Sequence, residues 1–204
     1  MQQVETISFD SLVTPALSKG ASVRNDFPGF REDYLALHCL IRKYKPQSFF
    51  EIGTSSGRGT KVICKAMSRR RFWPDTRERV YSLDVPPGTD SSILYPDGED
   101  GHPARTGSKN PYPYTQVFGD SMTLDVSPYL PIDGWFIDGK HDYEHARSET
   151  LTALSTEPSI IIWHDMQIDG VLRGVSEAML SAPDYRNRRI DGTRIGYAVL
   201  SRLD

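Results

Sequence analysis

Residues 49–59 read FFEIGTSSGRG, and this stretch decides the fold of the chain. A short apolar run carries one carboxylate, Glu51, and is followed by three glycines and three hydroxyl residues within seven positions. Such a run ending in a glycine-rich turn is typical of a buried strand that leads directly into a helix. The glycines fall at positions 53, 57 and 59, which fits neither the G-x-G-x-x-G fingerprint nor the Walker motif. The pattern that remains is E-x-G-x-x-x-G.

This turn predicts a ligand that carries both an amine and a carboxylate. Glycines at the carboxyl end of a strand let a ligand approach the backbone closely. With Thr54, Ser55 or Ser56 as the helix cap, free backbone N–H groups would accept a carboxylate, and Glu51 suits a cationic group. A tight turn that binds no ligand is the alternative.

Short apolar runs alternate with helical patterns along the chain, which predicts an α/β fold with a mostly parallel sheet covered on both faces. The expected strands are 48–52, 80–85, 115–118, 134–137, 159–163, 185–191 and 195–200. The expected helices are 33–44, 57–67, 143–154 and 171–180.

Three of the expected strands have a predicted place in the sheet. The run SIIIW at 159–163 has no polar side, so it belongs near the centre, where both faces are buried. Segments 185–191 and 195–200 are joined by Gly192 and Thr193 without a helix between them, so they form a closing antiparallel hairpin. An antiparallel strand would then end a parallel sheet.

Length and composition favour one domain across residues 1–204. Residues 1–44 form an N-terminal arm and a helix; the first 30 residues are expected to be irregular, and the helix to pack against the sheet edge. Residues 86–114 hold six prolines and four glycines and form an inserted loop that is a candidate lid.

The charge balance excludes several classes of partner. The formal net charge is -3 and the pI is near 6.0, so no global positive field draws the chain to nucleic acid or to an anionic membrane. Residues 69–79 hold a cluster of arginines, which we interpret as a solvated helix end and loop, with an acidic partner as the alternative. A small-molecule substrate is expected; homo-oligomer formation is left open.

The sequence carries no signal of secretion or of a disulfide. Cys39 and Cys64 each lie in an expected helix and outside any metal-binding spacing, so we expect two buried free thiols. No run of eighteen apolar residues and no basic start followed by an apolar run occurs. A cytoplasmic location is expected.

Acidic residues end three successive strands of the predicted sheet. Glu51 ends the first, Asp84 the second, and Asp120 followed by Ser121 the third. A carboxylate at the second position accepts hydrogen bonds from ribose hydroxyls, and an acid with a hydroxyl at the third suits an adenine edge. Strand-end aspartates that only cap the next turn are the alternative.

A second group of polar residues follows the fourth and fifth of these strands. The end of the fourth strand supplies Asp138, Lys140, His141 and Asp142, and the end of the fifth strand supplies His164 and Asp165. Because neighbouring parallel strands end at one edge of a sheet, these side chains are expected to meet and to form the reaction centre. His141 as a helix-start residue, and the pair His164 and Asp165 as a turn cap, are the alternatives.

From about residue 48 to the C-terminal hairpin, the chain resembles the class I S-adenosylmethionine-dependent methyltransferases, and in particular the family-24 type of small-molecule methyltransferase. The segments that carry the resemblance are EIGTSSG, VYSLD, GDS, FIDGKHDYEHARSET, IIIWHD and GVLRGVSEAM. The resemblance implies a Rossmann-like, doubly wound, seven-stranded sheet with a C-terminal antiparallel hairpin. It also implies S-adenosyl-L-methionine as cofactor.

The resemblance assigns cofactor contacts residue by residue. Glu51, Gly53 and Gly57 would line the methionine part, Asp84 the ribose, and Asp120 and Ser121 the adenine. Further candidate contacts are Thr54, Ser55 and Asp138.

The resemblance also implies a metal. Related sugar and natural-product O-methyltransferases bind a divalent ion through an aspartate after strand four and an acidic pair after strand five. The matching residues here are Asp138, His164 and Asp165. His164 replaces an acid, which makes the site less suited to Mg²⁺, a hard ion that prefers oxygen ligands.

The sequence therefore predicts methyl transfer from S-adenosylmethionine to a hydroxyl of a small molecule, a sugar or a secondary metabolite. His141 is the expected general base; Asp138 and Asp165, with His164, would hold a metal or orient the acceptor. Two alternatives stay open: a hydroxylase-like enzyme on the same fold, and a nucleoside-binding module without catalysis.

Overall fold

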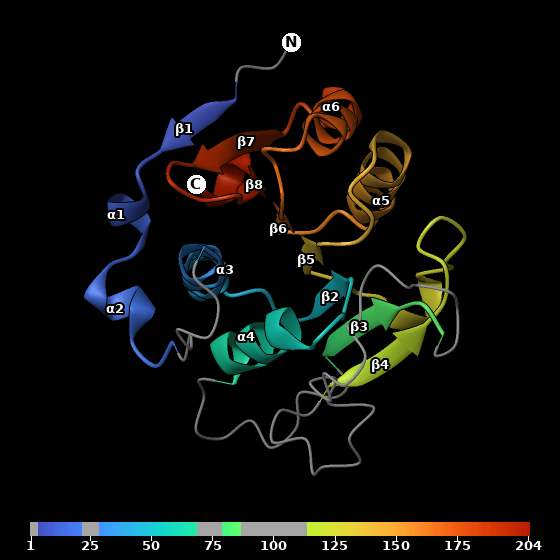
Figure 1. Cartoon of the computed structure of the whole chain (residues 1–204), viewed down its shortest axis with the longest axis horizontal. Helices are drawn as coiled ribbons and strands as arrows, with labels where there is room; N and C mark the ends of the chain where they lie inside the picture. The colour runs from blue at the N-terminus through green and yellow to red at the C-terminus, as the bar shows by residue number, and fades with distance from the viewer. Residues whose placement is uncertain (1–3, 22–28, 69–78, 87–113) are drawn as a thin grey trace.

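The structure is a computed structural model, and it describes residues 4–21, 29–68, 79–86 and 114–204 (Figure 1). The candidate lid at 86–114 lies almost entirely outside these residues, as does most of the arginine cluster at 69–79. Among the described helices, none is long and apolar enough to cross a membrane.

Within the described residues, the chain forms one sheet of eight strands in the order β1-β7-β8-β6-β5-β2-β3-β4. Every strand pair is parallel except the two that involve β8. The strands are β1 (Glu5–Ile7), β2 (Phe49–Ile52), β3 (Val80–Asp84), β4 (Thr115–Phe118), β5 (Gly134–Ile137), β6 (Ile160–Trp163), β7 (Tyr185–Ile190) and β8 (Gly196–Leu200).

All seven strands predicted from the sequence are confirmed, and the eighth, β1, comes from the N-terminal arm. The prediction that this arm is irregular was therefore wrong. Its residues pair in parallel with β7, and the arm continues into the short helices α1 (Phe9–Leu12) and α2 (Pro15–Ser18). The arm covers the backbone groups of β7 that would otherwise form an open sheet edge. Three residues are too few to show an alternating pattern in sequence.

The centre of the sheet was predicted correctly, but the position of the antiparallel strand was not. All four residues of β6 are buried, and the strand lies in the middle of the sheet order. β8 does not end the sheet, because it inserts between β6 and β7 and pairs antiparallel with both. The hairpin turn thus brings Arg194 and Ile195 back beside the end of β6, where the backbone N–H of Met166 donates to the carbonyl of Arg194 at 3.0 Å.

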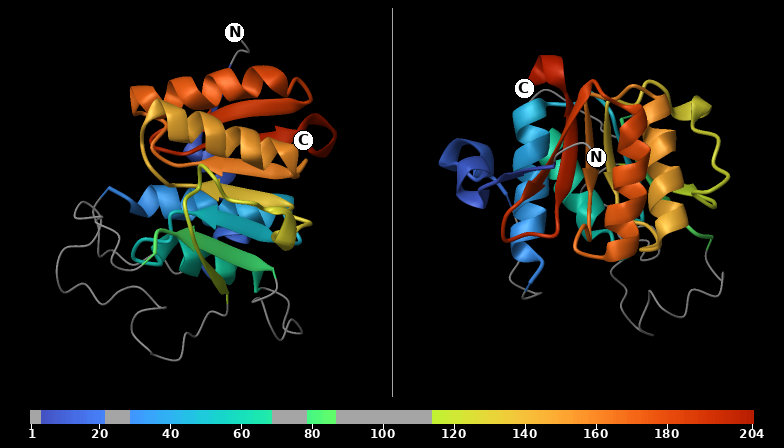
Figure 2. Two further views of the ribbon diagram at one scale, coloured as in Figure 1. Left: turned by 90° about the vertical axis from the view of Figure 1, so that its right-hand side faces the viewer. Right: turned by 90° about the horizontal axis from the view of Figure 1, so that it is seen from above.

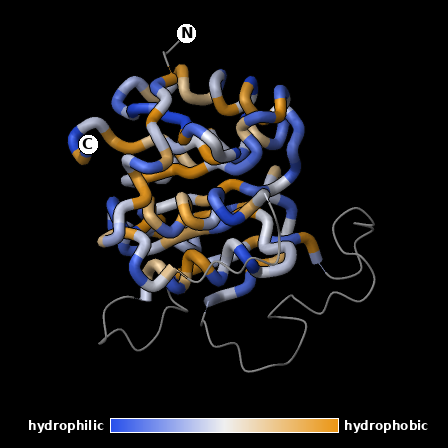
Figure 3. Tube along the Cα trace, turned by 60° about the vertical axis from the view of Figure 1, so that its left-hand side comes forward, coloured by the Kyte–Doolittle hydropathy of each residue, from blue (hydrophilic) through white to orange (hydrophobic). Residues whose placement is uncertain are grey.

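Helices cover both faces of the sheet (Figure 2). The helices α3 (Arg31–Tyr44) and α4 (Arg58–Met67) pack on one face, and α5 (Tyr143–Ser155) and α6 (Asp169–Ala178) on the other. Figure 3 shows the apolar segments running through the interior between these layers. Cys39 and Cys64 are buried free thiols in the first layer, as expected.

The expectation that the first long helix packs against the sheet edge was wrong. Leu37 and Leu40 of α3 are fully buried against side chains from β2, β6 and β8, which are central strands. The helix lies there because β1 and β7 extend the sheet beyond it. As a consequence, the first turn of α3 reaches the carboxyl edge of the strands, where β6 ends.

Candidate functional site

The glycine turn after β2 lies at the carboxyl edge of the sheet. Gly53 and Gly57 have φ angles of 94° and 72°, in the left-handed region that favours glycine. A Cβ at Gly53 would collide with the backbone carbonyl of Asp138 at the end of the neighbouring strand β5. This glycine is therefore required first of all because two strand ends approach each other closely.

Glu51 is fully buried behind this turn, beneath the first turn of α4. Its Oε2 accepts hydrogen bonds from the hydroxyls of Thr60 and Ser82, each at 2.5 Å. Its Oε1 has no hydrogen-bond partner in the part of the chain that the structure describes. Burial raises the pKa of Glu51 to about 8, although the two hydroxyl hydrogen bonds act in the opposite direction.

Oε1 of Glu51 lies against Gly59, where a Cβ would collide with it. Gly59, the third glycine of the stretch, therefore provides space for the carboxylate. A buried carboxylate oxygen without a partner costs free energy unless a donor reaches it, so this atom is suited to receive an N–H group of a ligand.

Asp84 ends β3 beside the same turn and is largely buried. Its Oδ2 accepts the backbone N–H of Ser55 at 3.0 Å, and its Oδ1 accepts the backbone N–H of Val85 at 2.8 Å. Both carboxylate oxygens of Asp84 therefore hold backbone beside the turn.

A buried polar network under the turn was not foreseen. The hydroxyl of Thr54 lies 2.6 Å from that of Ser82, and the amide of Gln116 donates to Thr54 at 2.9 Å. Ser82 was detectable in principle, because it is a polar residue inside the otherwise apolar strand VYSLD. Together these residues fix Thr54 and, through Ser82, the carboxylate of Glu51.

The predicted adenine residues lie after β4, and Asp120 is exposed while Ser121 is partly buried. Asp120 accepts the backbone N–H of Met122 at 2.9 Å, and Ser121 donates to Oε1 of Glu149 at 2.6 Å. Glu149, on α5, was missed from the sequence; burial raises its pKa to about 7. The sequence signal for Glu149 is its position three residues after Ala146, which places a carboxylate on the face of the helix that packs inward.

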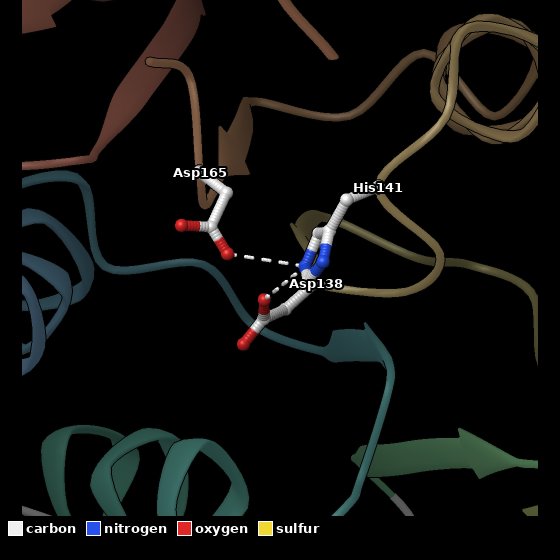
Figure 4. Close-up of side chains that lie close together, drawn as sticks. All are labelled: Asp138, His141 and Asp165. Carbon is white, nitrogen blue, oxygen red and sulfur yellow. Dashed lines mark ion pairs between the residues drawn. The ribbon is translucent and has the colours of Figure 1, made fainter. Parts of the chain in front are cut away.

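Three residues of the second predicted group, Asp138, His141 and Asp165, meet at the ends of β5 and β6 (Figure 4). Nε2 of His141 lies 3.1 Å from Oδ2 of Asp165 and 3.6 Å from Oδ1 of Asp138, so the ring faces both carboxylates. The atoms of these three residues that could bind a metal ion, one from each residue, all lie within 4.8 Å of one another. Asp165 has a φ of 53°, a left-handed conformation that costs free energy for a non-glycine residue and is typical of functional sites.

His164 lies behind this trio and is almost fully buried. Its Nδ1 is 2.9 Å from Oδ2 of Asp165 and 3.2 Å from Oδ1 of Asp138, and its Nε2 is 3.2 Å from Oδ2 of Asp33. Burial opposes a charged ring, but the hydrogen bonds to the three carboxylates raise the pKa of His164 to about 12. The role of His164 as a metal ligand stays a prediction. To bind an ion, His164 would have to give up one of these contacts.

The carboxylates and imidazoles change each other's protonation. Hydrogen bonds to Asp138 and Asp165 raise the pKa of His141 to about 9. Burial works against ionisation of Asp165, yet hydrogen bonds from both histidines hold its pKa well below the ordinary range. In this arrangement most of His141 carries a proton at neutral pH, and the neutral imidazole becomes common only as the pH approaches about 9.

Two members of the predicted group serve the start of α5 instead. Asp142 is the N-cap and accepts the backbone N–H of His145 at 3.0 Å, and Lys140 lies 3.0 Å from the same carboxylate. Backbone and side-chain hydrogen bonds lower the pKa of Asp142 against the effect of its desolvation. The chemistry at this edge is therefore concentrated in Asp138, His141, His164 and Asp165.

A comparison with models of protein families matches residues 50–166 to a family described as a methyltransferase domain. The match covers more than half of the chain, from β2 to the residue after Asp165. The chain belongs to this methyltransferase family. The resemblance drawn from EIGTSSG, FIDGKHDYEHARSET and IIIWHD is thereby confirmed.

Solved methyltransferase structures share the fold across almost the whole chain. The O-methyltransferase TomG from Streptomyces achromogenes, involved in tomaymycin synthesis and solved with SAM, is 17% identical with a TM-score of 0.59, over 94% of this chain and 93% of that one. An O-methyltransferase from Bacillus cereus, solved with SAH, is 15% identical with a TM-score of 0.55, over 94% and 90%.

MycE, from the mycinamycin pathway and solved with Mg, SAH and mycinamycin VI, is 16% identical with a TM-score of 0.55, over 95% of this chain and 56% of that one. At such identities the likeness establishes the fold. No curated protein sequence matches the chain.

In this methyltransferase the carboxyl edge of the sheet divides into two halves. The first half consists of the strand ends of β2, β3 and β4, with Glu51, Asp84 and Ser121, and we name it the cofactor half after the contacts predicted for these residues. The acid–imidazole half consists of the ends of β5 and β6, with the carboxylates of Asp138 and Asp165 and the imidazoles of His141 and His164. Gly53 packs on the backbone of Asp138 and so fixes the two halves against each other.

Proposed function

We propose that this methyltransferase transfers a methyl group from S-adenosylmethionine to a hydroxyl of a small molecule. The observation that carries the proposal is His141, which is partly exposed and faced by the carboxylates of Asp138 and Asp165 at the edge next to the glycine turn. Both carboxylates face the same nitrogen, Nε2, and an imidazole that is oriented in this way through one nitrogen can take a hydroxyl proton at the other, here Nδ1.

The residues of the cofactor half fit S-adenosylmethionine. Oε1 of Glu51 lacks a partner among the described residues, and it would pair with the amino group of the methionine part. The turn of Gly53, Thr54, Ser55 and Gly57 would line that part. Asp84 ends β3 beside this turn, and its carboxylate would accept hydrogen bonds from the ribose hydroxyls.

For the adenine, Asp120 is exposed and its Oδ2 can accept the exocyclic amine. Ser121 donates to Glu149, which leaves its own oxygen lone pairs to accept from the adenine edge. The structures of TomG and of the Bacillus cereus enzyme, which contain SAM and SAH, support this assignment through their shared fold.

S-adenosylmethionine supplies an activated methyl group on a sulfonium, so the chain contributes placement and one proton transfer. His141 takes the hydroxyl proton, and Asp138 and Asp165 stabilise the imidazolium that forms. The carboxylates hold Nε2 throughout, so the neutral form of His141 takes the proton at Nδ1, and this form becomes more common as the pH rises towards about 9.

The same residues offer an alternative to general-base catalysis, a divalent metal, for which His141 would be a ligand and not the base. Asp138, His141 and Asp165 offer two carboxylates and one imidazole within 4.8 Å of one another. A bound ion would lower the pKa of the acceptor hydroxyl. A set that includes an imidazole is better suited to Mn²⁺, Fe²⁺ or Zn²⁺ than to Mg²⁺.

The proposed acceptor is a sugar or a secondary metabolite. The acidic chain is unsuited to nucleic acid, and the fold is shared with enzymes of tomaymycin and mycinamycin synthesis. A sugar or phenol hydroxyl is the group that a paired imidazole and carboxylate can deprotonate.

The test is incubation of the full chain with methyl-labelled S-adenosylmethionine and a panel of hydroxylated sugars, phenols and macrolides, with Mg²⁺, Mn²⁺ or EDTA. We expect a labelled methyl group on an oxygen of the acceptor with the wild-type chain and no such product with His141→Ala. Binding of S-adenosylhomocysteine without labelled product for any acceptor would favour the nucleoside-binding module instead.

A further inference from the structure

The first turn of α3 contributes a carboxylate to the acid–imidazole half of the edge. Asp33 is 2% exposed, and its Oδ2 lies 3.2 Å from Nε2 of His164. Its Oδ1 accepts the backbone N–H of Arg194 at 2.8 Å, in the turn between β7 and β8. Asp33 therefore joins helix α3, the hairpin turn and the end of β6 at one point, although none of its partners is near it in sequence.

His164 carries this contact onward to the site. Its other nitrogen lies between the carboxylates of Asp165, at 2.9 Å, and Asp138, at 3.2 Å, and these two carboxylates face His141. The contacts thus form an unbroken series from Asp33 through His164 and the two carboxylates to His141.

Aromatic rings hold the plane of His164. Phe30 stacks on it with centroids 5.8 Å apart and an interplanar angle of 13°, and Phe136 meets it edge-on at 6.3 Å. With the plane fixed, the remaining freedom of the ring is to slide in its plane or to flip by 180° about the Cβ–Cγ bond, which puts a carbon atom in the place of each nitrogen. The carboxylate of Asp33 on one nitrogen fixes which edge of the ring meets Asp165.

We propose that Asp33 is a positioning residue of the methyl-transfer site, which through His164 sets the carboxylates of Asp138 and Asp165 against His141. The inference rests on the proposed function for its purpose, since it assigns Asp33 to the site that carries out methyl transfer. It assigns Asp33 no contact with substrate. Partners behind the groups that do the chemistry commonly orient them, and their loss typically costs about 10- to 100-fold in activity.

Arg194 offers a second route that the experiment must separate. Its guanidinium lies 4.0 Å from Asp33, 3.8 Å from Asp165 and over the ring of Phe30 at 4.2 Å. Asp33 could therefore influence Asp165 through this side chain and not through the imidazole. Removing the imidazole while Arg194 stays in place distinguishes the two routes.

The test uses the ring ¹⁵N and ¹H NMR signals of the ligand-free full chain, which has five histidines, assigned by single replacements. Asp33→Asn is expected to shift the ring signals of His141, with which Asp33 has no direct contact. In a His164→Gln background the same substitution is expected to leave His141 unchanged. The matched control is Glu32→Gln, which removes a neighbouring carboxylate that is 44% exposed and paired with Arg31.

Two outcomes would overturn the proposal. One is a His141 signal that Asp33→Asn moves no more than Glu32→Gln does, and the other is an equal shift with and without His164. A purely structural Asp33 would lower the free energy of unfolding and leave His141 where it is. If Asp33→Asn does not fold, Asp33→Ser replaces it, because serine is accepted in the first turn of a helix.

The failure of this proposal and the failure of the proposed function are distinguishable. The NMR experiment needs neither cofactor nor acceptor, whereas the proposed function fails if S-adenosylhomocysteine does not bind the wild-type chain in calorimetry. Where methyl transfer is observed, Asp33→Asn is expected to lower kcat about 10- to 100-fold with little change in KM. A raised KM at unchanged kcat would contradict a positioning role.

Discussion

The two halves of the carboxyl edge satisfy their carboxylates in different ways. In the cofactor half, Asp84 accepts backbone N–H groups and Glu51 accepts hydroxyls, so neutral donors hold both acids. In the acid–imidazole half, Asp138 and Asp165 face His141 and His164. Neutral donors fix the shape of a turn, whereas imidazoles can also give up or take a proton.

The contrast agrees with the tasks that we propose for the two halves. A buried acid such as Glu51, with one oxygen unpaired among the described residues, is suited to bind a cationic group of a ligand. The paired acids and imidazoles of the other half are suited to proton transfer and to a metal. Substitutions in the first half should therefore change cofactor binding, and those in the second should change turnover.

The largest expected effect is on turnover, in the acid–imidazole half. His141→Ala should lower kcat by about 10²- to 10⁴-fold, because it removes the proposed base, and should leave the affinity for S-adenosylhomocysteine unchanged. The matched control is His145→Ala, one turn further along, where the ring pairs with Asp142 at 2.8 Å. Equal activity of the two variants in the labelled-methyl assay would remove His141 from the chemistry.

The next largest effect is on cofactor affinity, in the cofactor half. Glu51→Gln should weaken binding of S-adenosylhomocysteine by about 10- to 100-fold, the usual cost of losing a hydrogen bond to a charged group. In the wild type the affinity should rise as the pH approaches about 8, where Glu51 loses its proton and can pair with an ammonium group. Calorimetry at several pH values measures both effects.

The control for that measurement is Glu144→Gln, an exposed position in the first turn of α5. The same affinity for Glu51→Gln and Glu144→Gln, with no difference in pH dependence, would show that Glu51 serves only the fold.

How much of this contrast could be predicted from the sequence depends on how local the contacts are. The glycine turn, Asp84 and the pair His164 and Asp165 were all found, because strand, turn and strand-end residue follow one another in sequence. Their position at one edge of the sheet was also predictable, because neighbouring parallel strands end at the same edge. The eighth strand was missed, since its three residues form a strand only by pairing with β7.

The supporting contacts of the site could not be predicted in the same way. Asp33 and His164 are 131 residues apart, and an acid in the first turn of a helix suggests nothing more than helix stabilisation. Glu149 reaches Ser121 across 28 residues from a different element. Such pairs are determined by the packing of helices on the sheet, for which a single sequence holds no pattern.

A smaller effect concerns the packing behind Glu51. Gly59→Ala should lower the free energy of unfolding by about 1–3 kcal/mol, the usual cost of overpacking, because the new Cβ would collide with the carboxylate of Glu51. Gly119→Ala is the matched control, since its Cβ would meet only methyl groups of Leu83 and Leu124 at 3.7 and 3.9 Å. Denaturant unfolding measures both, and equal stability would mean that the glycine provides no space for Glu51.

The smallest expected effect is a pH dependence of stability that belongs to the cofactor half. The pKa of Glu51 is raised from 4.5 to about 8 in the folded chain, so between these values the folded state keeps a proton that the unfolded state has lost. Stability from this group is therefore greatest below about pH 4.5 and is lost as the pH rises towards 8. The wild type should lose about 1 kcal/mol more than Glu51→Gln between about pH 6.5 and 7.5. Parallel pH profiles of the two chains would contradict the raised pKa.

The most direct test of the central claim is a calorimetric titration of S-adenosylhomocysteine into the wild-type chain and into Glu51→Gln. We expect saturable binding at one site in the wild type and markedly weaker binding in the variant. Absence of binding to the wild type would contradict the account of the whole carboxyl edge, and equal binding by both chains would contradict the role of Glu51 in holding the cofactor.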